Sequence, residues 1–292
     1  MKTRIYIQLM GGIGNQLFQY SCAKNLSLKL RAEIIFDDNT GFKNDKIFKR
    51  KLELPKKLIK RRINLDEKIF FLFIKIIKKT FFKKKIFITF GNTIIIDETR
   101  ETEFINNFFN LTKKYKNIYL IGFFQTEKYF LENKIKIMNS IISNLRIGKL
   151  FLNLKKQISD KSTMVGIRLF EEAPIKIRRN FGGLETLNFI NNSISKIKKK
   201  DIYIFTTFDY KKKLKKSIKY NFKLITLKSG FKGNSLEYLS MMSNFKNFII
   251  TNSSFYWWAV YISEYKNKNN IKICASKKFL NKDSVPKRWM VK

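Results

Sequence analysis

Short apolar runs alternate along this chain with longer stretches in which apolar residues recur at helical spacing. At the start, the β-rich alternation of residues 4–10 predicts a strand, and the apolar spacing of residues 17–26 predicts a helix. Residues 40–90 are basic and irregularly patterned, and we expect them to be mostly helical. Further strands are predicted at 33–36 and 118–121, and a further helix within 133–160.

The second half of the chain repeats strands and helices in regular alternation. Strands are predicted at 162–168, 201–207, 222–226, 248–250 and 271–275, and helices at 184–198, 210–220, 236–244 and 255–262. Because alternating strands and helices form parallel sheets with right-handed crossovers, the pattern predicts an α/β fold. The length of 292 residues fits about two domains, which we place at 1–155 and 156–292.

The most apolar stretch runs from Ile69 to Phe90, but lysines interrupt it before it reaches the ~20 apolar residues of a membrane span. We favour a core helix with a lysine-rich outer face; the alternative is a basic, aromatic segment at a membrane interface. The first residues form the predicted strand and contain no cleavable apolar leader. We therefore expect a cytoplasmic protein, with peripheral contact at the inner face of an anionic membrane as a further option.

The net charge is +39, from 61 basic and 22 acidic residues, and such a field attracts nucleic acid, anionic lipid and sugar nucleotides. We ascribe the amount of charge mainly to a compositional bias toward Lys, Ile, Phe and Asn, typical of an AT-rich genome. A non-catalytic protein that binds polyanions or membrane surfaces is an alternative. No nucleic-acid-binding motif occurs, so we expect no specific nucleic-acid partner.

Histidine is absent from the sequence, which excludes a Ser-His-Asp or Cys-His catalytic device and any His-ligated metal site. Any catalytic base is therefore Asp, Glu, Lys, Tyr or a water-mediated group. Cys22 and Cys274 are isolated in apolar segments, so we expect free buried thiols in a reducing cytosol rather than a disulfide or zinc site.

Two polar turns lie between a predicted strand and a predicted helix, which is where α/β proteins bind ligands. The first, Gly11–Gln16, is rich in glycine, which permits positive φ and close approach of the backbone to a ligand. The second, Thr251–Ser254, precedes the aromatic helix Phe255–Ile262, whose free N–H groups and positive dipole end attract a phosphate. The alternative for both turns is an ordinary helix cap that binds nothing.

Four segments, in the same order along the chain, resemble glycosyltransferase family 11, the α-1,2-fucosyltransferases. Gly11–Tyr20 is similar to the family's Gly-Gly-x-Gly-Asn-Gln-x-Phe-Gln-Tyr, and Asn252–Trp258 to its Asn-Ser-Ser-Phe-Ser-Trp-Trp. Tyr119–Phe130 resembles its Tyr-Leu-x-Gly-Tyr-Trp-Gln-Ser-x-x-Tyr-Phe, and Pro286–Trp289 is the fourth and least specific segment. Together the four segments span nearly the whole chain.

Two family motifs are altered in this sequence. The family's His-x-Arg-Arg-Gly-Asp corresponds to residues 166–171, where Arg168 and the acid Glu171 remain and Gly166 replaces the histidine. The family's Phe-Ser-Asp-Asp corresponds to Phe205–Phe208, which lacks both aspartates. Because those aspartates suit nucleotide contacts, a glycosyltransferase with a different nucleotide-sugar donor is an alternative.

The resemblance implies two Rossmann-like domains facing a cleft, a GT-B-like α/β fold with an acceptor-side N-terminal domain and a nucleotide-sugar-side C-terminal domain. It implies inverting, metal-independent transfer of fucose from GDP-fucose to a hydroxyl of a glycan acceptor in surface polysaccharide synthesis, without a cofactor. The sequence agrees on the metal, since it contains no Asp-x-Asp pair to hold a divalent ion on a diphosphate.

The same resemblance leads to candidate site residues. We expect Arg168, a guanidinium at a predicted strand end, to stabilise the departing diphosphate, and Glu171, with Glu172 as second choice, to act as the base. We expect Trp257 and Trp258 to belong to the core, and Phe255 is open between packing and ligand contact. The substrate-binding candidates are Gly12, Gly14, Asn15, Gln16, Asn252, Ser253, Ser254 and Phe255.

Overall fold

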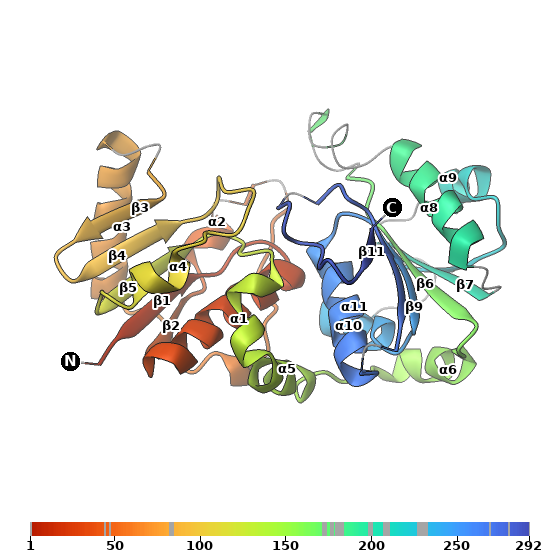
Figure 1. The fold of residues 1–292 in the computed structure, drawn as a ribbon, viewed down its shortest axis with the longest axis horizontal. Helices are drawn as coiled ribbons and strands as arrows, with labels where there is room; N and C mark the ends of the chain where they lie inside the picture. The colour runs from red at the N-terminus through yellow and green to blue at the C-terminus, as the bar shows by residue number, and fades with distance from the viewer. Residues whose placement is uncertain are drawn as a thin grey trace. The chain divides into compact units, whose positions relative to one another are not determined.

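The computed structural model divides into two compact units, Met1–Asn144 (unit 1) and Leu145–Lys292 (unit 2). Each unit is an α/β domain built on its own sheet (Figure 1). The predicted boundary after residue 155 falls inside α6 (Lys149–Gln157), which belongs to unit 2 because Phe151 packs against Tyr238 with ring centroids 4.8 Å apart. The structure describes residues 2–43, 45–46, 48–81, 85–170, 174–175, 178, 184–197, 201–206, 211–226, 233–268, 270–279 and 281–291.

Unit 1 contains a mostly parallel sheet. Its described strands are β1 (Arg4–Gln8), β2 (Glu33–Asp37), β3 (Phe87–Phe90), β4 (Thr93–Asp97) and β5 (Asn117–Ile121). Their order is β2-β1-β5-β4-β3, and all neighbours are parallel except β3, which runs antiparallel to β4. Its described helices are α1 (Ile13–Leu30), α2 (Thr40–Lys43), α3 (Leu65–Phe81), α4 (Phe108–Thr112) and α5 (Lys134–Ile142), with 3-10 turns η1 (Lys56–Leu58), η2 (Glu127–Tyr129) and η3 (Leu131–Asn133).

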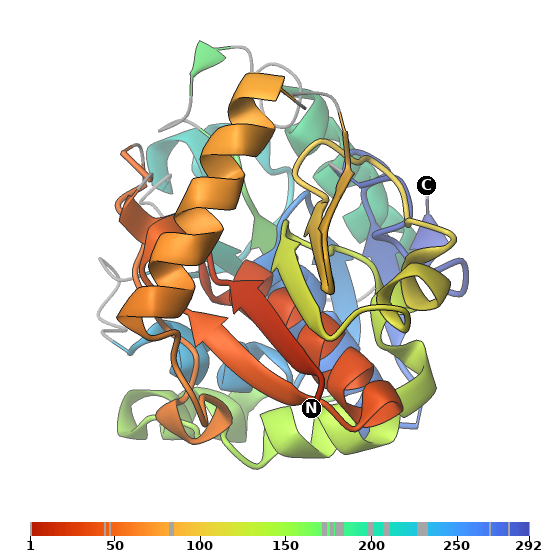
Figure 2. The same ribbon diagram turned by 90° about the vertical axis from the view of Figure 1, so that its left-hand side faces the viewer.

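Alternating strand residues give the sheet of unit 1 two buried faces. Tyr6, Ile35 and Tyr119 share a core cluster with Phe71 and Ile74 of α3. Phe71 stacks on Tyr119 with ring centroids 4.1 Å apart. Helix α1 covers the opposite face of the sheet (Figure 2). The strand predicted near the start of the chain and the helix that follows it are confirmed.

We expected one core helix over Ile69–Phe90, and the structure corrects this prediction. The helix ends before this stretch does, and β3 forms its last part. Phe71 and Ile74 are buried, as a core helix requires. Among the described side chains of residues 69–81, three other apolar ones keep more than half of their surface exposed: Ile69 (56%), Phe73 (59%) and Ile76 (64%). The stretch has apolar residues on more sides than one sheet can cover, so helical spacing turns several of them outward.

Unit 2 contains a sheet in which every described pair of neighbouring strands is parallel. The strands are β6 (Ser162–Ile167), β7 (Asp201–Thr206), β8 (Lys223–Ile225), β9 (Asn247–Ile250), β10 (Lys272–Ala275) and β11 (Met290–Val291), in the order β11-β10-β9-β6-β7-β8. The described helices are α6, α8 (Leu184–Ile197), α9 (Lys211–Ser217), α10 (Ser235–Met242) and α11 (Ser254–Lys266). The predicted α/β fold with two parallel-sheet domains is confirmed.

Helix α11 lies in the core of unit 2 and anchors the end of the chain. Trp257 and Trp258 are fully buried, which confirms that they belong to the core. Glu264, also buried, accepts hydrogen bonds from Nε and Nη2 of Arg288 at 2.8 and 2.7 Å and from Nε1 of Trp289 at 3.0 Å. The fourth family-like segment, Pro286–Trp289, is therefore held against α11 by hydrogen bonds. None of the described helices has the length and the run of apolar residues that crossing a bilayer would require.

Candidate functional site

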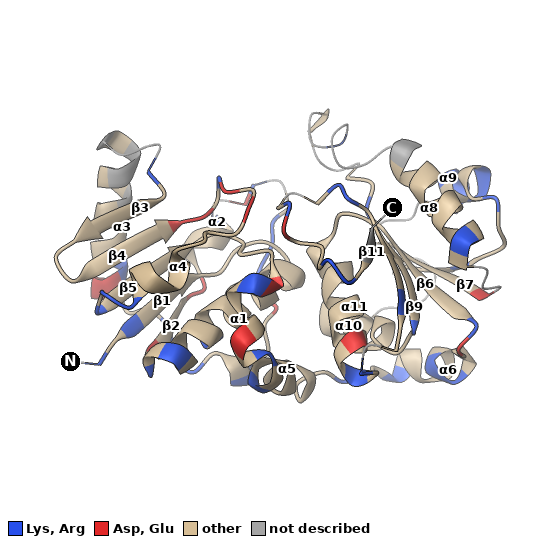
Figure 3. Cartoon of the chain, viewed as in Figure 1, with Lys and Arg blue, Asp and Glu red and all other residues tan. Residues whose placement is uncertain are grey.

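Charge does not single out one site, because Lys and Arg are spread over both units (Figure 3). The two candidate turns mark more definite places. Gly11–Gln16 follows β1 and Thr251–Ser254 follows β9, so each turn leaves the carboxyl end of a strand in a mostly parallel sheet. Open α/β sheets bind ligands at this edge. Each unit therefore carries one candidate site.

The glycine-rich turn of unit 1 ends in a helix start that is already occupied. Gly11 has a φ of +73°, and the Asn15 side chain fills the space where a Cβ on Gly11 would lie. Gly12 precedes α1 in an extended conformation, and the N–H of Ile13 donates to the Glu53 carboxylate at 3.1 Å. A carboxylate of the chain itself thus takes the anion position at the start of α1, which disfavours a phosphate there.

Gln16 holds this turn in place through its side-chain amide. Nε2 donates to the carbonyl oxygens of Gly11 and Lys51, both at 2.9 Å. Oε1 accepts from the N–H groups of Glu53 and Leu54 at 2.8 and 3.1 Å. Gln16 is fully buried, so its polar atoms are directed at the backbone rather than at a ligand. It positions the turn against segment 51–54.

The glycine-rich turn also bonds to the loop that follows β5. Gln19 donates from Nε2 to the carbonyl of Gly122 at 2.8 Å, and its Oε1 accepts from the N–H of Met10 at 3.1 Å. Gln125 donates from Nε2 to Oδ1 of Asn15 at 2.7 Å. The first two family-like segments along the chain, Gly11–Tyr20 and Tyr119–Phe130, therefore form one hydrogen-bonded cluster. Gln19 and Gln125 were not among the predicted site residues, although both lie within those segments.

Glu98, directly after β4, is a buried carboxylate beneath this loop. Its Oε2 accepts from the N–H groups of Phe123 and Phe124 at 2.9 and 3.1 Å. Burial raises the pKa of Glu98 to about 7, although the two N–H donors act in the opposite direction. A Cβ at Gly122 would collide with Glu98, so the loop requires glycine there. Sequence reasoning missed Glu98 because it did not predict the strand that precedes it.

In unit 2, the ends of β6 and β9 are joined beside Arg168. The N–H of Arg168 donates to Oγ1 of Thr251 at 2.9 Å, and that hydroxyl donates to the carbonyl of Gly166 at 3.1 Å. The Arg168 guanidinium lies 5.1 Å from the centre of the Phe170 ring. Arg168 is 8% exposed. The structure thus brings this predicted arginine next to the second candidate turn.

The second candidate turn leads into α11. The N-terminus of α11 is less occupied by side chains of the chain itself than the N-terminus of α1 is. Asn252 is buried, and Ser253 and Ser254 are half-buried. Among the described residues, the Ser253 side chain makes no capping hydrogen bond to α11. The start of α1, in contrast, has a carboxylate bonded to its first N–H. Of the two turns, the one before α11 is therefore better suited to a phosphate.

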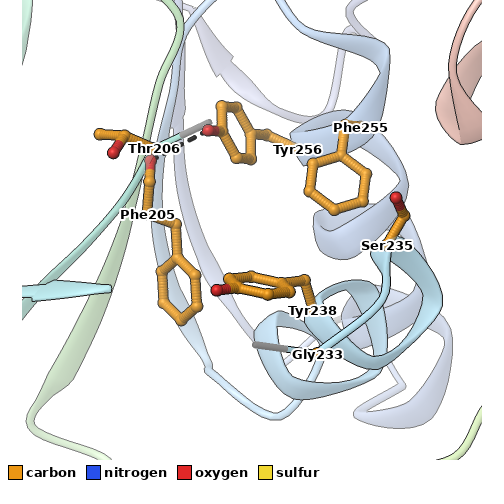
Figure 4. Close-up of a pocket in the computed structure, with 7 residues that line it drawn as sticks. All are labelled: Phe205, Thr206, Gly233, Ser235, Tyr238, Phe255 and Tyr256. Carbon is orange, nitrogen blue, oxygen red and sulfur yellow. Dashed lines mark hydrogen bonds between the residues drawn. The ribbon is translucent and has the colours of Figure 1, made fainter. Parts of the chain in front are cut away.

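A hollow of about 120 Å³ lies beside the start of α11. Figure 4 shows aromatic rings from β7, α10 and α11 around it. Its described lining residues are Phe205, Thr206, Gly233, Ser235, Tyr238, Phe255 and Tyr256. Aromatic walls beside a helix N-terminus suit a flat ring that carries phosphate groups. Within the described residues, no group of three or more acidic or cysteine side chains is arranged to hold a metal ion.

Comparison with known proteins identifies the family. The sequence matches the profile described as Glycosyl transferase family 11 over residues 4–291. The chain belongs to glycosyltransferase family 11. This family 11 glycosyltransferase is 28% identical over 284 residues to an Escherichia coli alpha-1,2-colitosyltransferase, with 89% of this chain and 88% of that protein covered. Family membership overturns the alternative of a non-catalytic basic binding protein.

Solved structures place the family 11 glycosyltransferase among known folds. A mutant of Arabidopsis thaliana FUT1 in complex with GDP has a TM-score of 0.52 and 12% identity, and the match covers 94% of this chain and 70% of that one. The fucosyltransferase NodZ from Bradyrhizobium has a TM-score of 0.41 and 13% identity, with 89% and 91% covered. The FUT1 likeness agrees with a GT-B-type fold.

Two positions at which this family 11 glycosyltransferase departs from the family motifs pack against each other. Gly166 stands where the family motif has histidine, and Tyr256 where it has serine. The Tyr256 ring lies against Gly166, where any Cβ would collide with it. Its hydroxyl is 3.1 Å from the carbonyl oxygen of Ile167 and 3.0 Å from that of Phe205. The larger side chain at 256 thus occupies the space beside the smaller one at 166.

The predicted site residues of the family 11 glycosyltransferase fall into separate groups. Gly14 is buried in the first turn of α1, next to Asn15, which bonds to Gln125. Phe255 lines the hollow of unit 2, so it is not solely a core residue. Glu171 and Glu172, the predicted bases, lie outside the described residues.

Proposed function

We propose that this family 11 glycosyltransferase moves fucose from GDP-fucose to a hydroxyl of a glycan acceptor, with inversion and without a metal ion. The aromatic hollow beside the start of α11, with Arg168 at the neighbouring strand end, is the observation that carries the proposal. Aromatic walls favour stacking of a nucleobase. A helix N-terminus and a guanidinium favour a diphosphate. The GDP bound to the FUT1 mutant is consistent with a GDP-sugar donor.

The proposed reaction is a single displacement at the anomeric carbon. The acceptor oxygen forms its bond to that carbon as the bond to the diphosphate breaks, and the acceptor proton passes to a base. Negative charge therefore grows on the departing diphosphate in the transition state. Arg168 is placed to stabilise it because the planar guanidinium matches phosphate oxygens in pairs. Glu171, with Glu172 as second choice, is the base that we propose.

We place the glycan acceptor at the carboxyl edge of unit 1. There the half-buried Asn15 and Gln125 form a polar pair, and the Arg50 guanidinium lies 3.6 Å from where a Cβ on Gly12 would be. Because Glu53 already occupies the start of α1, this edge suits neutral sugar hydroxyls better than phosphate. The proposed product is a surface polysaccharide, made in the cytoplasm; the free buried cysteines fit a reducing compartment.

A second donor is favoured by two specific observations. The Escherichia coli relative is an alpha-1,2-colitosyltransferase, so a colitosyl donor is the leading alternative to GDP-fucose. Tyr256 lines the hollow and fills the space beside Gly166, which gives the proposed donor site a different shape from one with the family's histidine and serine. Either sugar leaves the roles proposed for Arg168 and the α11 N-terminus unchanged.

Calorimetric titration with GDP in EDTA tests the donor site. The wild-type chain should bind GDP, and the double variant Ser253→Ala/Ser254→Ala should bind it more weakly. The matched control is Ser195→Ala, at an exposed serine of α8 in the same unit. Melting is recorded alongside to establish that both variants fold; little loss of stability is expected, because Ser253 makes no capping hydrogen bond to α11. Unchanged affinity in a folded double variant would reject the phosphate role.

A further inference from the structure

Helix α3 presents a stripe of large apolar side chains to solvent. We define the α3 outer face by Leu65 (70% exposed), Ile69 (56%), Leu72 (41%), Phe73 (59%) and Ile76 (64%). Four of these positions follow i, i+4, i+7, i+11 spacing and the fifth lies beside them, so they form one continuous stripe. Figure 2 shows α3 along the outside of the sheet of unit 1. A continuous apolar surface of this kind marks an interaction site.

The sequence that carries the stripe is strongly basic. Residues 65–96 contain seven lysines and two acidic residues, Asp66 and Glu67, which lie in the first turn of α3. The lysines are Lys68, Lys75, Lys78, Lys79, Lys83, Lys84 and Lys85. A partner that covers the α3 outer face must therefore supply both apolar surface and negative charge.

We propose that the α3 outer face docks on an anionic lipid bilayer, with the helix axis in the plane of the interface. A bilayer surface offers hydrocarbon and anionic headgroups together, whereas nucleic acid offers charge without apolar surface. A second copy of the chain fits poorly. A symmetric contact would bring two copies of this lysine-rich segment together, and like charges repel. The helix is 17 residues long and basic, so it lies in the interface and does not cross it.

Vesicle sedimentation with the full chain tests the proposal. Vesicles of phosphatidylcholine alone are compared with vesicles that also contain phosphatidylglycerol, in 0.1 M and 1 M NaCl. The wild-type chain should bind the anionic vesicles, and part of this binding should survive 1 M NaCl because salt screens charges but not apolar contact. The triple variant Ile69→Gln/Phe73→Gln/Ile76→Gln should bind on the order of a hundredfold more weakly.

The matched control changes three equally exposed apolar residues elsewhere: Leu131→Gln (51% exposed), Ile135→Gln (66%) and Leu150→Gln (53%). Its vesicle binding should equal that of the wild type. Circular dichroism and the melting temperature establish that both variants fold, as expected for exposed positions.

Four results would overturn the proposal. The first is wild-type binding by the α3 variant, and the second is complete release of the wild-type chain at 1 M NaCl. The third is sedimentation of the wild-type chain as a dimer that the α3 variant converts to a monomer, which would make the face a contact between copies. An equal loss in the control variant would also count against it, because the effect would then belong to surface apolarity in general.

Discussion

Replacing Gly166 with alanine should expel the Tyr256 ring from its place in unit 2. The added Cβ would collide with this ring, with its two δ carbons at 2.7 and 2.8 Å. Overpacking a tight site costs about 1–3 kcal/mol. Moving the ring also removes the hydrogen bond of the Tyr256 hydroxyl to strand carbonyls, which contributes about 1 kcal/mol. Gly166→Ala should therefore lower the free energy of unfolding by about 2–4 kcal/mol.

Chemical denaturation followed by tryptophan emission measures this loss. All three tryptophans of the chain, Trp257, Trp258 and Trp289, lie in unit 2. Tyr256→Phe is the matched control, since it keeps the ring, removes the hydroxyl and should cost about 1 kcal/mol. Adding Tyr256→Ser to Gly166→Ala relieves the collision, so the double variant should be more stable than the two single losses predict by about 1–3 kcal/mol. Additive losses, or a Gly166→Ala loss below about 1 kcal/mol, would refute the reasoning.

Three further variants test other contacts. Gln16→Leu removes the partner of four backbone groups and should lower the free energy of unfolding by about 4 kcal/mol by circular dichroism; a negligible loss would contradict its positioning role. Burial raises the pKa of Glu98 from 4.5 to about 7, so its contribution to stability is present below pH 4.5 and lost as pH rises through 7. The unfolding free energy should fall by on the order of 3 kcal/mol over that window, and Glu98→Gln should abolish the fall; an unchanged pH profile would reject this origin. Arg168→Lys should reduce turnover on the order of a hundredfold at saturating donor, and near wild-type turnover would place the diphosphate elsewhere.

Much of unit 2 could be predicted from the sequence, because short apolar runs alternate regularly there with stretches of helical spacing. The strand predicted at 162–168 is observed as Ser162–Ile167, and the aromatic helix begins at Ser254. In unit 1, β3 and β4 were missed. β3 lies within Ile69–Phe90, which we expected to be a helix, and β4 is a short apolar run that follows it directly.

The candidate site was harder to predict because its contacts join distant parts of the chain. The bonds of Gln16 to segment 51–54 and the packing of Tyr256 on Gly166 depend on tertiary structure, not on local pattern. Motif resemblance found the turns but could not separate residues that shape a turn, such as Gln16, from residues that line a hollow, such as Phe255. The outward side of α3 was mispredicted because we favoured a core helix with a lysine-rich outer face, whereas that side carries exposed apolar residues.

The donor assay tests the central claim most directly. Nucleotide release and glycan product are measured in EDTA with GDP-fucose, GDP-colitose, GDP-mannose and UDP-sugars over a panel of glycan acceptors. The proposed function predicts that GDP-fucose gives the fastest transfer without added metal, and that the product has the anomeric configuration opposite to that of the donor. Transfer only from a UDP-sugar, strict dependence on a divalent cation, or retention of the anomeric configuration would contradict it.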